Sequence, residues 1–568
     1  LYLNGELVTD LVVPAGITEV KCFAFTGCQS ITTLVVPEGV TTVGCEAFCH
    51  CYNLADIQLP ETLTTLYFGA FSRTGIETIS FPAAVTELPD WIVDNCQNLT
   101  EVELPATLTY IGQYAFAGCN NLTSISIPGT VTSIRENAFE NCSVLKTVIN
   151  FSNLTFTAGS EDYGYIALNA DKVINAPNGS MVGDYLFATI DGVNTLVGYV
   201  GNATDIVLPE NFNGQSYAIG SNAFAGNEDI VALTIPAAVT RINGGAFIGC
   251  AGLTTLRIED GEDTLVLGCN ITSEDESVTG EGLFYNIPLE TLYIGRNLEY
   301  PTGKANGRSP FDRIVTLTDV TFGNTVTTIG YNLFGSCSGI RNVAIPSSVT
   351  SIRDCAFFEC ISLESVAMPE NVTEFGDRVF CYCSSLREIT IPTGVTTLGY
   401  ATFYGCTSLE NIVIPAGVEV IVHHAFSGCS SLKNVTIPEG VTSIGDAAFQ
   451  NCTSLESVTV PSTASLAWGV FHGCTSLSVL SFAEGMESIG GSEVFHGCSA
   501  LESITIPASV TQIGDKGFKN CTSLSDITCL ATTPPAVVNG TFTNIAENAT
   551  LYVPRDCGAA YAATEWSQ

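Results

Sequence analysis

Positive charge is scarce in this chain of 568 residues: 19 Lys and Arg stand against 57 Asp and Glu, which gives a formal net charge of -38. A surface with that balance repels phosphate backbones and anionic lipid headgroups. Nucleic acid is therefore not expected as a partner. Long apolar runs are missing too, since no stretch approaches the roughly 18 uninterrupted apolar residues that a membrane-spanning helix needs. We expect no membrane span within this sequence.

The chain also lacks the short motifs of common catalysts. No G-x-S-x-G, H-E-x-x-H, Walker A or dinucleotide-binding sequence occurs, and five histidines are too few to support a Ser/His/Asp set. We predict a non-enzymatic protein with no catalytic residue, no cofactor and no metal site. The hydrophobic fraction of 46% and the charged fraction of 13% are those of a folded chain, so an acidic disordered protein is excluded.

What the chain has in abundance is repetition. Between Arg341 and Pro461, prolines and cysteines recur every 23 residues. A fixed period of this length indicates a solenoid, in which each coil buries its apolar face only by stacking on its neighbours. The repeating cysteines form a column that we call the thiol ladder: Cys337, Cys360, Cys383, Cys406, Cys429 and Cys452.

Each repeat predicts the same three pieces. The L-x-x-I-x-I-P segment alternates as a strand does and is closed by Pro, and V-T-x-I-G predicts a second extended piece. The A-F-x-G-C segment predicts one tight helical turn that packs its Phe inward. The fold class is therefore a β-rich solenoid of short parallel strands, with one helical turn per coil, curved as a rod or horseshoe. Each buried Phe is worth roughly 1.5 to 3 kcal/mol, and the predicted column includes Phe357, Phe380, Phe403, Phe426 and Phe449.

Breaks in the period divide the chain into five predicted parts. A first repeat array is followed by an insertion whose YLFATIDGVNTLVGYVG sequence predicts a hairpin around Asp191 and Gly192. Irregular repeats with loop insertions come next, then a regular array and an atypical end that suits a cap. The parts are 1–150, 151–206, 207–320, 321–528 and 529–568.

The repeated phrase resembles a known family. The segment LTSISIPGTVTSIRENAFENC at 122–142 and its copies are similar to the BspA-like leucine-rich repeat of surface proteins from gut and oral anaerobic bacteria and some protist parasites. The resemblance implies a leucine-rich repeat solenoid, an extracellular location at the cell surface, and adhesion to host matrix proteins or other cells. It brings no catalytic motif. The sequence opens without Met, so we expect any export signal or anchor to lie outside it.

The 23 cysteines allow two interpretations. An exported protein ordinarily uses them in disulfides. Fifteen of them, however, share one slot of the repeat, and Thr74 and Asn227 fill that slot in other coils. Because Thr and Asn cannot form a bridge, we favour a ladder of free buried thiols. Cys22 and Cys45 occupy a different slot that is predicted to be exposed, and whether they are bridged stays open.

Other candidate sites also have two interpretations. His472 and His496 follow equivalent phenylalanines and could make a two-ligand metal site, but we favour neutral loop histidines. The acidic segments 258–263 and 273–277 could bind calcium, yet they lack the spacing of an EF-hand loop, so we favour solvated loops.

The exposed strand face offers the most specific hypothesis. Its outer column holds small residues in almost every coil, with Arg257 and Tyr293 as exceptions. We expect any binding site to lie there, with a protein or glycan on a host or neighbouring cell as partner. The alternatives are a carbohydrate-binding or polysaccharide-processing solenoid and a passive surface spacer. A second column alternates in charge from coil to coil and should help to fix the register: Arg341, Glu364, Arg387, Glu410, Lys433 and Glu456.

Overall fold

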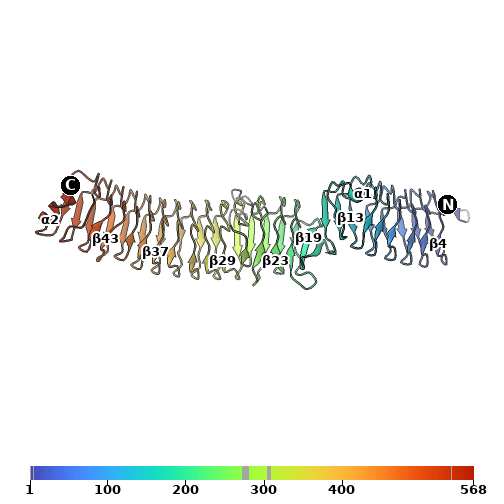
Figure 1. The fold of residues 1–568 in the computed structure, drawn as a ribbon, viewed down its shortest axis with the longest axis horizontal. Coiled ribbons are helices and arrows are strands. Elements are labelled where there is room, and N and C mark those ends of the chain that lie inside the picture. Colours follow the sequence, from blue (N-terminus) through green and yellow to red (C-terminus); the bar gives the residue numbers. More distant parts are fainter. Residues whose placement is uncertain (1, 4–5, 271–280, 303–308, 539, 568) are drawn as a thin grey trace. The chain divides into compact units, whose positions relative to one another are not determined.

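The computed structural model describes residues 2–3, 6–270, 281–302, 309–538 and 540–567. It divides into two compact units, Leu1–Gly201 and Asn202–Gln568. In each unit, successive coils of the chain lie side by side in sequence order (Figure 1). The predicted parallel solenoid is confirmed, whereas the five-part division remains a prediction.

Each regular coil contributes one strand to each of two parallel ladders. Strand β30 (Asn342–Ala344) pairs with β32 (Ser365–Ala367), and β31 (Ser351–Ile352) pairs with β33 (Glu374–Phe375). Partners in both pairs are 23 residues apart, for example Asn342 and Ser365. One repeat of the sequence is therefore one turn of the solenoid.

In the first unit, the hairpin expected around Asp191 is present, since Ile190 pairs antiparallel with Val193. The first ladder comprises β3 (Asp10–Val12), β5 (Thr33–Val35), β7 (Asp56–Gln58), β9 (Thr78–Ser80), β11 (Glu101–Glu103), β13 (Ser124–Ile127), β15 (Thr147–Asn150) and β16 (Lys172–Asn175). The second comprises β4 (Glu19–Val20), β6 (Thr42–Val43), β8 (Thr65–Leu66), β10 (Glu87–Leu88), β12 (Tyr110–Ile111) and β14 (Ser133–Ile134). The other elements are β1 (Tyr2–Leu3), β2 (Glu6–Leu7), α1 (Asp162–Tyr165), β17 (Ser180–Val182), β18 (Tyr185–Ile190) and β19 (Val193–Tyr199).

The second unit also has two parallel ladders, which comprise more coils. Besides β30 and β32, the first comprises β20 (Asp205–Val207), β22 (Ala232–Ile235), β24 (Thr255–Ile258), β26 (Thr291–Ile294), β28 (Asp319–Phe322), β34 (Glu388–Ile389), β36 (Asn411–Val413), β38 (Asn434–Thr436), β40 (Ser457–Val460), β42 (Val479–Phe482), β44 (Ser503–Ile506), β46 (Asp526–Cys529) and β47 (Thr550–Tyr552). Besides β31 and β33, the second comprises β21 (Tyr217–Ile219), β23 (Val239–Ile242), β25 (Leu265–Leu267), β27 (Leu298–Glu299), β29 (Thr328–Ile329), β35 (Thr397–Leu398), β37 (Val420–Ile421), β39 (Ser443–Ile444), β41 (Ser465–Leu466), β43 (Ser488–Ile489) and β45 (Gln512–Ile513). Two short helical elements end the chain, α2 (Gly558–Ala562) and η1 (Glu565–Ser567).

The third side of each coil corrects the sequence prediction, because the A-F-x-G-C segment is a run of tight turns and not a helical turn. In the regular coils, two residues in the left-handed region flank the core Phe, as Cys355 (φ 59°) and Glu359 (φ 57°) flank Phe357. Every second N–H group of this segment points toward the next coil. The N–H groups of Cys355, Phe357 and Glu359 donate to carbonyls of that coil at 2.8 to 3.0 Å. A helical turn would use these N–H groups internally and leave the neighbouring coil without donors.

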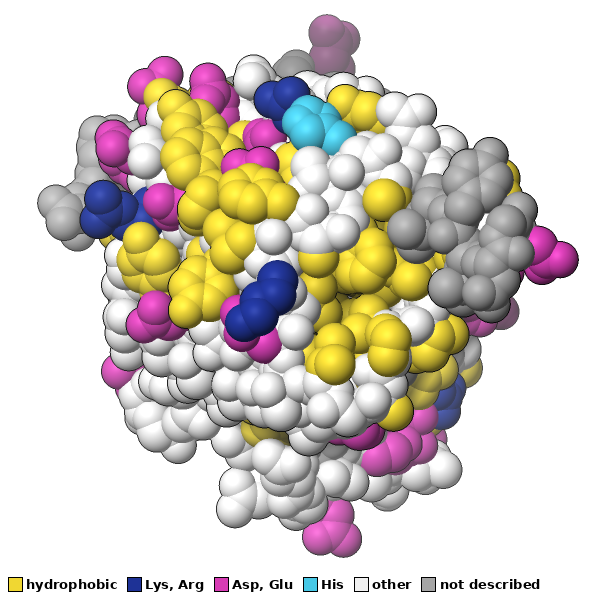
Figure 2. Space-filling view, turned by 90° about the vertical axis from the view of Figure 1, so that its right-hand side faces the viewer, with side chains coloured by type: hydrophobic (Ala, Val, Ile, Leu, Met, Phe, Trp, Pro, Cys, Tyr) yellow, Lys and Arg dark blue, Asp and Glu magenta, His cyan; other side chains and the backbone are white. Residues whose placement is uncertain are grey.

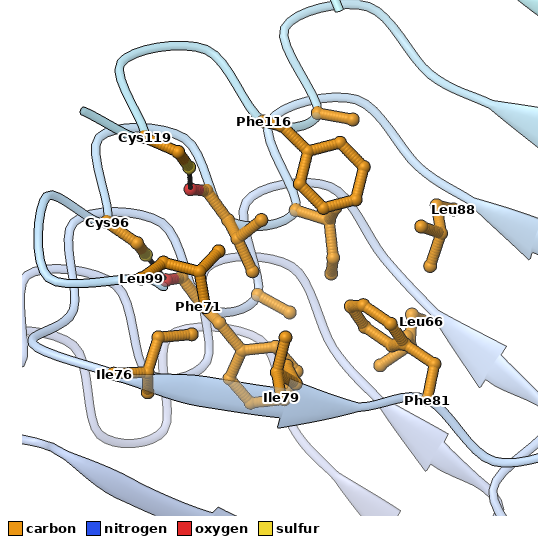
Figure 3. Close-up of a cluster of buried hydrophobic side chains, with 14 of the residues drawn as sticks. Leu66, Phe71, Ile76, Ile79, Phe81, Leu88, Cys96, Leu99, Phe116 and Cys119 are labelled. Atoms are coloured by element: carbon orange, nitrogen blue, oxygen red, sulfur yellow. Dashed lines mark hydrogen bonds between the residues drawn. The ribbon is translucent and has the colours of Figure 1, made fainter. Parts of the chain in front are cut away.

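The core of both units is a column of stacked aromatic rings. Phe426 and Phe449 lie 5.0 Å apart between ring centroids with an interplanar angle of 7°, and both are fully buried. Figure 3 shows the arrangement in the first unit, where Phe71 and Phe116 point inward among Leu66, Leu88 and Ile79. Rings of the predicted column stack in the same way through Phe357, Phe380, Phe403, Phe426 and Phe449.

Candidate functional site

Arg257 and Tyr293 lie opposite each other on adjacent strands, β24 and β26. The Arg257 guanidinium carbon sits 4.0 Å from the centre of the Tyr293 ring, which is a cation–π contact. The Tyr293 hydroxyl donates to both carboxylate oxygens of Asp260, at 2.9 and 3.0 Å. Partial burial and the bond to Asp260 raise the pKa of Tyr293, so the hydroxyl stays protonated near neutral pH. The three side chains hold one another in place on the strand face.

The strand column holds Thr234 and Thr321 on either side of this cluster. In the regular coils this column is exposed, and Val413 is 75% exposed. The alternating charge column contains ion pairs between adjacent coils, Arg341 with Glu364 at 3.1 Å and Lys433 with Glu410 at 3.2 Å. All four side chains are well exposed, so each pair contributes little stability.

A buried arginine beneath the cluster escaped the sequence analysis. Arg296 is fully buried, and its guanidinium donates to the carbonyl oxygens of Ala237 and Pro236, both at 2.9 Å. Burial lowers the pKa of Arg296, while the carboxylates of Asp263 and Glu259 oppose that shift. The only available signal was an Arg that directly follows the Gly at a strand-closing position. Arg296 thus lies against Gly261 of the acidic segment 258–263, and its hydrogen bonds connect the coil of β26 to the coil of β22.

The acidic segments give no calcium site in the described residues. Asp260 is engaged by Tyr293, and 258–263 does not gather three carboxylates that could hold one ion. The second segment, 273–277, lies outside the described residues.

A hollow on the turn side of the first unit also escaped the sequence analysis. Gly69 occupies the column position that Glu46 fills in the coil before and Trp91 in the coil after, and the missing side chain leaves a hollow of about 440 Å³. Phe68 and Trp91 are 43% and 40% exposed, and Trp91 stacks on Tyr114 of the next coil at 5.9 Å. The polar lining is supplied by Glu46, His50, Arg73 and Asp94.

Apolar and acidic side chains are exposed together on this unit. Figure 2, which views the end where the chain starts, shows them side by side with only a few basic groups.

The thiol ladder is buried, and none of the 23 cysteines, all within the described residues, is in a disulfide. Each ladder thiol donates to the carbonyl of the Phe in the previous coil, as Cys383 Sγ does to Phe357 O at 3.1 Å. Figure 3 shows the same bond from Cys96 and Cys119, the latter to Val93 O. Burial raises the pKa of these thiols, to about 12 for Cys337 and Cys474. Protonated, buried thiols are donors in the core and not reactive groups.

Cys22 and Cys45 are adjacent free thiols in the structure. The Cys45 N–H donates to Cys22 Sγ at 3.2 Å, and a side-chain hydrogen bond with the Cys22 thiol raises the pKa of the Cys45 thiol. Their bridging in solution remains a prediction to be tested.

His472 and His496 do meet, with ring centroids 4.6 Å apart. Glu493 joins them, a residue that the sequence analysis did not consider. Burial and the neighbouring His496 lower the pKa of His472, so this ring is neutral at pH 7.

The comparison with protein families decides the classification. The model of the BspA type leucine-rich repeat region matches residues 18–146, 199–305, 304–429 and 396–525. This chain belongs to the BspA-type leucine-rich repeat family. No curated protein matches this BspA-type chain. Among the described residues, no helix has the length and apolar character to cross a bilayer.

Solved structures similar to this BspA-type chain include other repeat proteins. A leucine-rich repeat protein from Bacteroides ovatus has 22% identity and a TM-score of 0.41, covering 66% of this chain and 100% of its own. A leucine-rich cell surface protein from Faecalibacterium prausnitzii has 24% identity and a TM-score of 0.30, covering 68% and 98%. The pneumococcal vaccine antigen PcpA has 15% identity and a TM-score of 0.38, covering 67% and 99%.

Proposed function

We propose that this BspA-type chain is a non-enzymatic binding protein displayed at a cell surface, which engages a protein of a host matrix or a neighbouring cell. The observation that carries the proposal is the Arg257–Tyr293–Asp260 cluster, whose Arg and Tyr stand between Thr234 and Thr321 in the strand column. Family membership supports a binding role over catalysis.

The geometry of the cluster suits the anchor of an interface. Arg and Tyr are enriched among the residues that dominate binding energy. Because Tyr293 is held by Asp260 and Arg257 by the Tyr293 ring, little side-chain freedom remains to be lost on binding. The small neighbours Thr234 and Thr321 would let a partner approach closely and exclude water around the anchor.

The test is a binding survey with matrix proteins, followed by substitution of the anchor. Arg257→Ala and Tyr293→Ala should each weaken the best ligand by about tenfold or more, since hot-spot truncations cost above roughly 1.4 kcal/mol. Thr436→Ala, in the same column of a regular coil, is the matched control and should have no effect. Absence of saturable binding, or binding that both variants retain, would contradict the proposal and favour the passive spacer.

The hollow at Gly69 supports a second candidate function, glycan binding. Carbohydrate sites combine aromatic faces with carboxylates and Arg, and the hollow has Trp91 beside Glu46, Arg73 and Asp94. A glycan array should then give a ligand that is lost in Trp91→Ala and in Gly69→Asn, since Asn tolerates the φ of +62° and fills the hollow. Tyr382→Ala, an exposed turn-side aromatic of the second unit, should retain binding. Loss in all three variants would reject this location.

A further inference from the structure

Three side chains with metal-binding atoms converge on the turn side of the second unit. His472 and His496 directly follow Phe471 and Phe495 in adjacent coils, so coil stacking brings their rings together. Glu493 lies two residues before Phe495 at a left-handed position (φ 59°), from which its carboxylate reaches the same point. One ligand atom from each of the three lies within 4.8 Å of the others.

One nitrogen in this cluster lacks a hydrogen-bond partner among the described residues. This atom is Nδ1 of His496, and it is buried. It faces Glu493 Oε2 at 3.6 Å, which is too long for a hydrogen bond. Two ligands of one tetrahedral zinc ion lie about 3.4 Å apart when each bond is about 2.0 to 2.2 Å. The 3.6 Å between His496 Nδ1 and Glu493 Oε2 is therefore close to the separation of two atoms that bind the same zinc ion.

The surrounding groups orient the three ligands. Asn520 bonds the other nitrogen of His496 at 2.9 Å, and the Gln450 amide lies 3.5 Å from His472 Nδ1, which leaves Nε2 of that ring for a metal. Such outer contacts fix ring orientation around metal ions, and an amide can present either its oxygen or its nitrogen. Lys516 contacts Glu493 Oε1 at 3.1 Å, so the opposite oxygen, Oε2, is directed to the histidines.

We propose that His472, Glu493 and His496 form a binding site for a divalent transition metal of the zinc type. Two imidazoles and one carboxylate match the donor preference of zinc, whereas calcium requires six or more oxygen ligands. The fourth position is open to water or to a donor from a partner. His472, Glu493 and His496 are all half-buried, so the cluster lies near the surface although His496 Nδ1 itself is covered. Bound metal would join adjacent coils through their turn sides.

The test uses the full chain after treatment with a chelator, titrated with ZnCl₂ by calorimetry. One ion should bind with a dissociation constant below about 10 µM. His496→Ala and Glu493→Gln should each weaken binding by about tenfold or more. His423→Ala, which removes an exposed imidazole beside a single carboxylate, Asp446, is the matched control and should bind as the parent does.

Two further measurements separate a built site from adventitious binding. Cobalt substitution should give the intense visible absorption of tetrahedral coordination, and this band should be absent in His496→Ala. Lys516→Met should tighten zinc binding, because it removes the cation that competes for Glu493. A stoichiometry that no variant changes, or a dissociation constant near 1 mM, overturns the proposal.

Discussion

Each ladder cysteine donates a thiol hydrogen bond to a backbone carbonyl of the core column. Thr can occupy the same slot because its hydroxyl can also donate to a Phe carbonyl. Each Phe carbonyl accepts one N–H from its own coil and a thiol from the next, as Phe357 O does from Cys360 and Cys383. The Thr74 hydroxyl donates at 2.9 Å to Phe71 O of its own coil, an acceptor that it shares with the thiol of Cys96. The slot therefore selects a small donor and not a bridge.

A first prediction concerns alkaline pH. Burial raises the folded-state pKa of the ladder thiols above their ordinary value near 9, so the unfolded chain loses thiol protons first as pH rises. Stability is then complete below pH 9 and falls above it, by about 1.4 kcal/mol per buried thiol at pH 10. Circular dichroism from pH 7 to 11 should show steep unfolding.

Replacement of ladder thiols gives the control for this prediction. A triple variant of Cys406, Cys429 and Cys452 to Thr should show a shallower alkaline loss, because Thr has no proton to release. Cys22→Ser, at an exposed position where only the contact with Cys45 is lost, should change the profile much less than the triple variant does. An alkaline profile of the triple variant identical to that of the parent would contradict the mechanism.

A second prediction concerns Arg296. Arg296→Met should destabilise the second unit by about 1 to 3 kcal/mol, since it removes the charged donor from Ala237 O, whereas Pro236 O keeps the N–H of Val239. Chemical denaturation followed by tryptophan fluorescence measures the change. Arg241→Met, which removes an exposed arginine, is the control and should cost less than about 0.5 kcal/mol. Equal losses of stability in the two variants would show that the burial of Arg296 does not determine its contribution to stability.

At the scale of the element, the left-handed residues of the turn side determine which substitutions are tolerated. Gly428 follows Phe426 by two residues with φ of +77°, and Asn451 and Asn520 fill the same position in other coils. An added Cβ at Gly428 would meet only ordinary contacts with Gly405. Conformation and not space therefore limits this position.

This gives a third prediction, in which the larger Asn at position 428 destabilises the protein less than the smaller Ala. Gly428→Ala should destabilise the unit by about 1 kcal/mol, because Ala is strained in the left-handed region. Gly428→Asn should cost less, because Asn adopts that region more readily. Midpoints of urea denaturation compare the two variants. A smaller cost for Ala than for Asn would show that side-chain volume governs the position.

The strands of this protein could be read from its sequence, but the turns could not. Alternation of Ile and polar residues indicates a strand whatever its neighbours do. In A-F-x-G-C, the small residue and the Phe fit a helical turn equally well. What excludes the helix is the donation of Cys355, Phe357 and Glu359 N–H groups to the next coil, and single-coil patterns carry no such information.

The candidate sites show the same limit. Arg257 and Tyr293 were found because they interrupt a column, and the 23-residue period places columns without a structure. Glu493 was missed because its column differs from that of His472 and His496, and only the left-handed turn brings the three together. The hollow at Gly69 depends on an absent side chain between two large ones.

At the scale of the molecule, each repeat is a module whose removal should preserve the fold. As a fourth prediction, deletion of residues 410–432 should give a folded protein, whereas deletion of 410–420 should not, because half a coil puts strands out of register. The one-coil deletion places Arg387 beside Lys433. Adding Lys433→Gln should therefore recover a few tenths of a kcal/mol. Thermal melts of the three proteins decide this.

The backbone hydrogen bonds beside the core Phe column have one further consequence, because their N–H groups donate to the coil that follows, whereas the ladder thiols donate to the coil before. Phe357 donates to the coil after it, and Phe403 and Phe449 do the same. On this side, the first coil of a stack would present carbonyl acceptors and the last would present N–H donors. Two copies meeting end to end would thus be complementary only head to tail, a heterologous contact that grows into open filaments unless a terminal segment blocks it. The two ends of the array need chemically different caps.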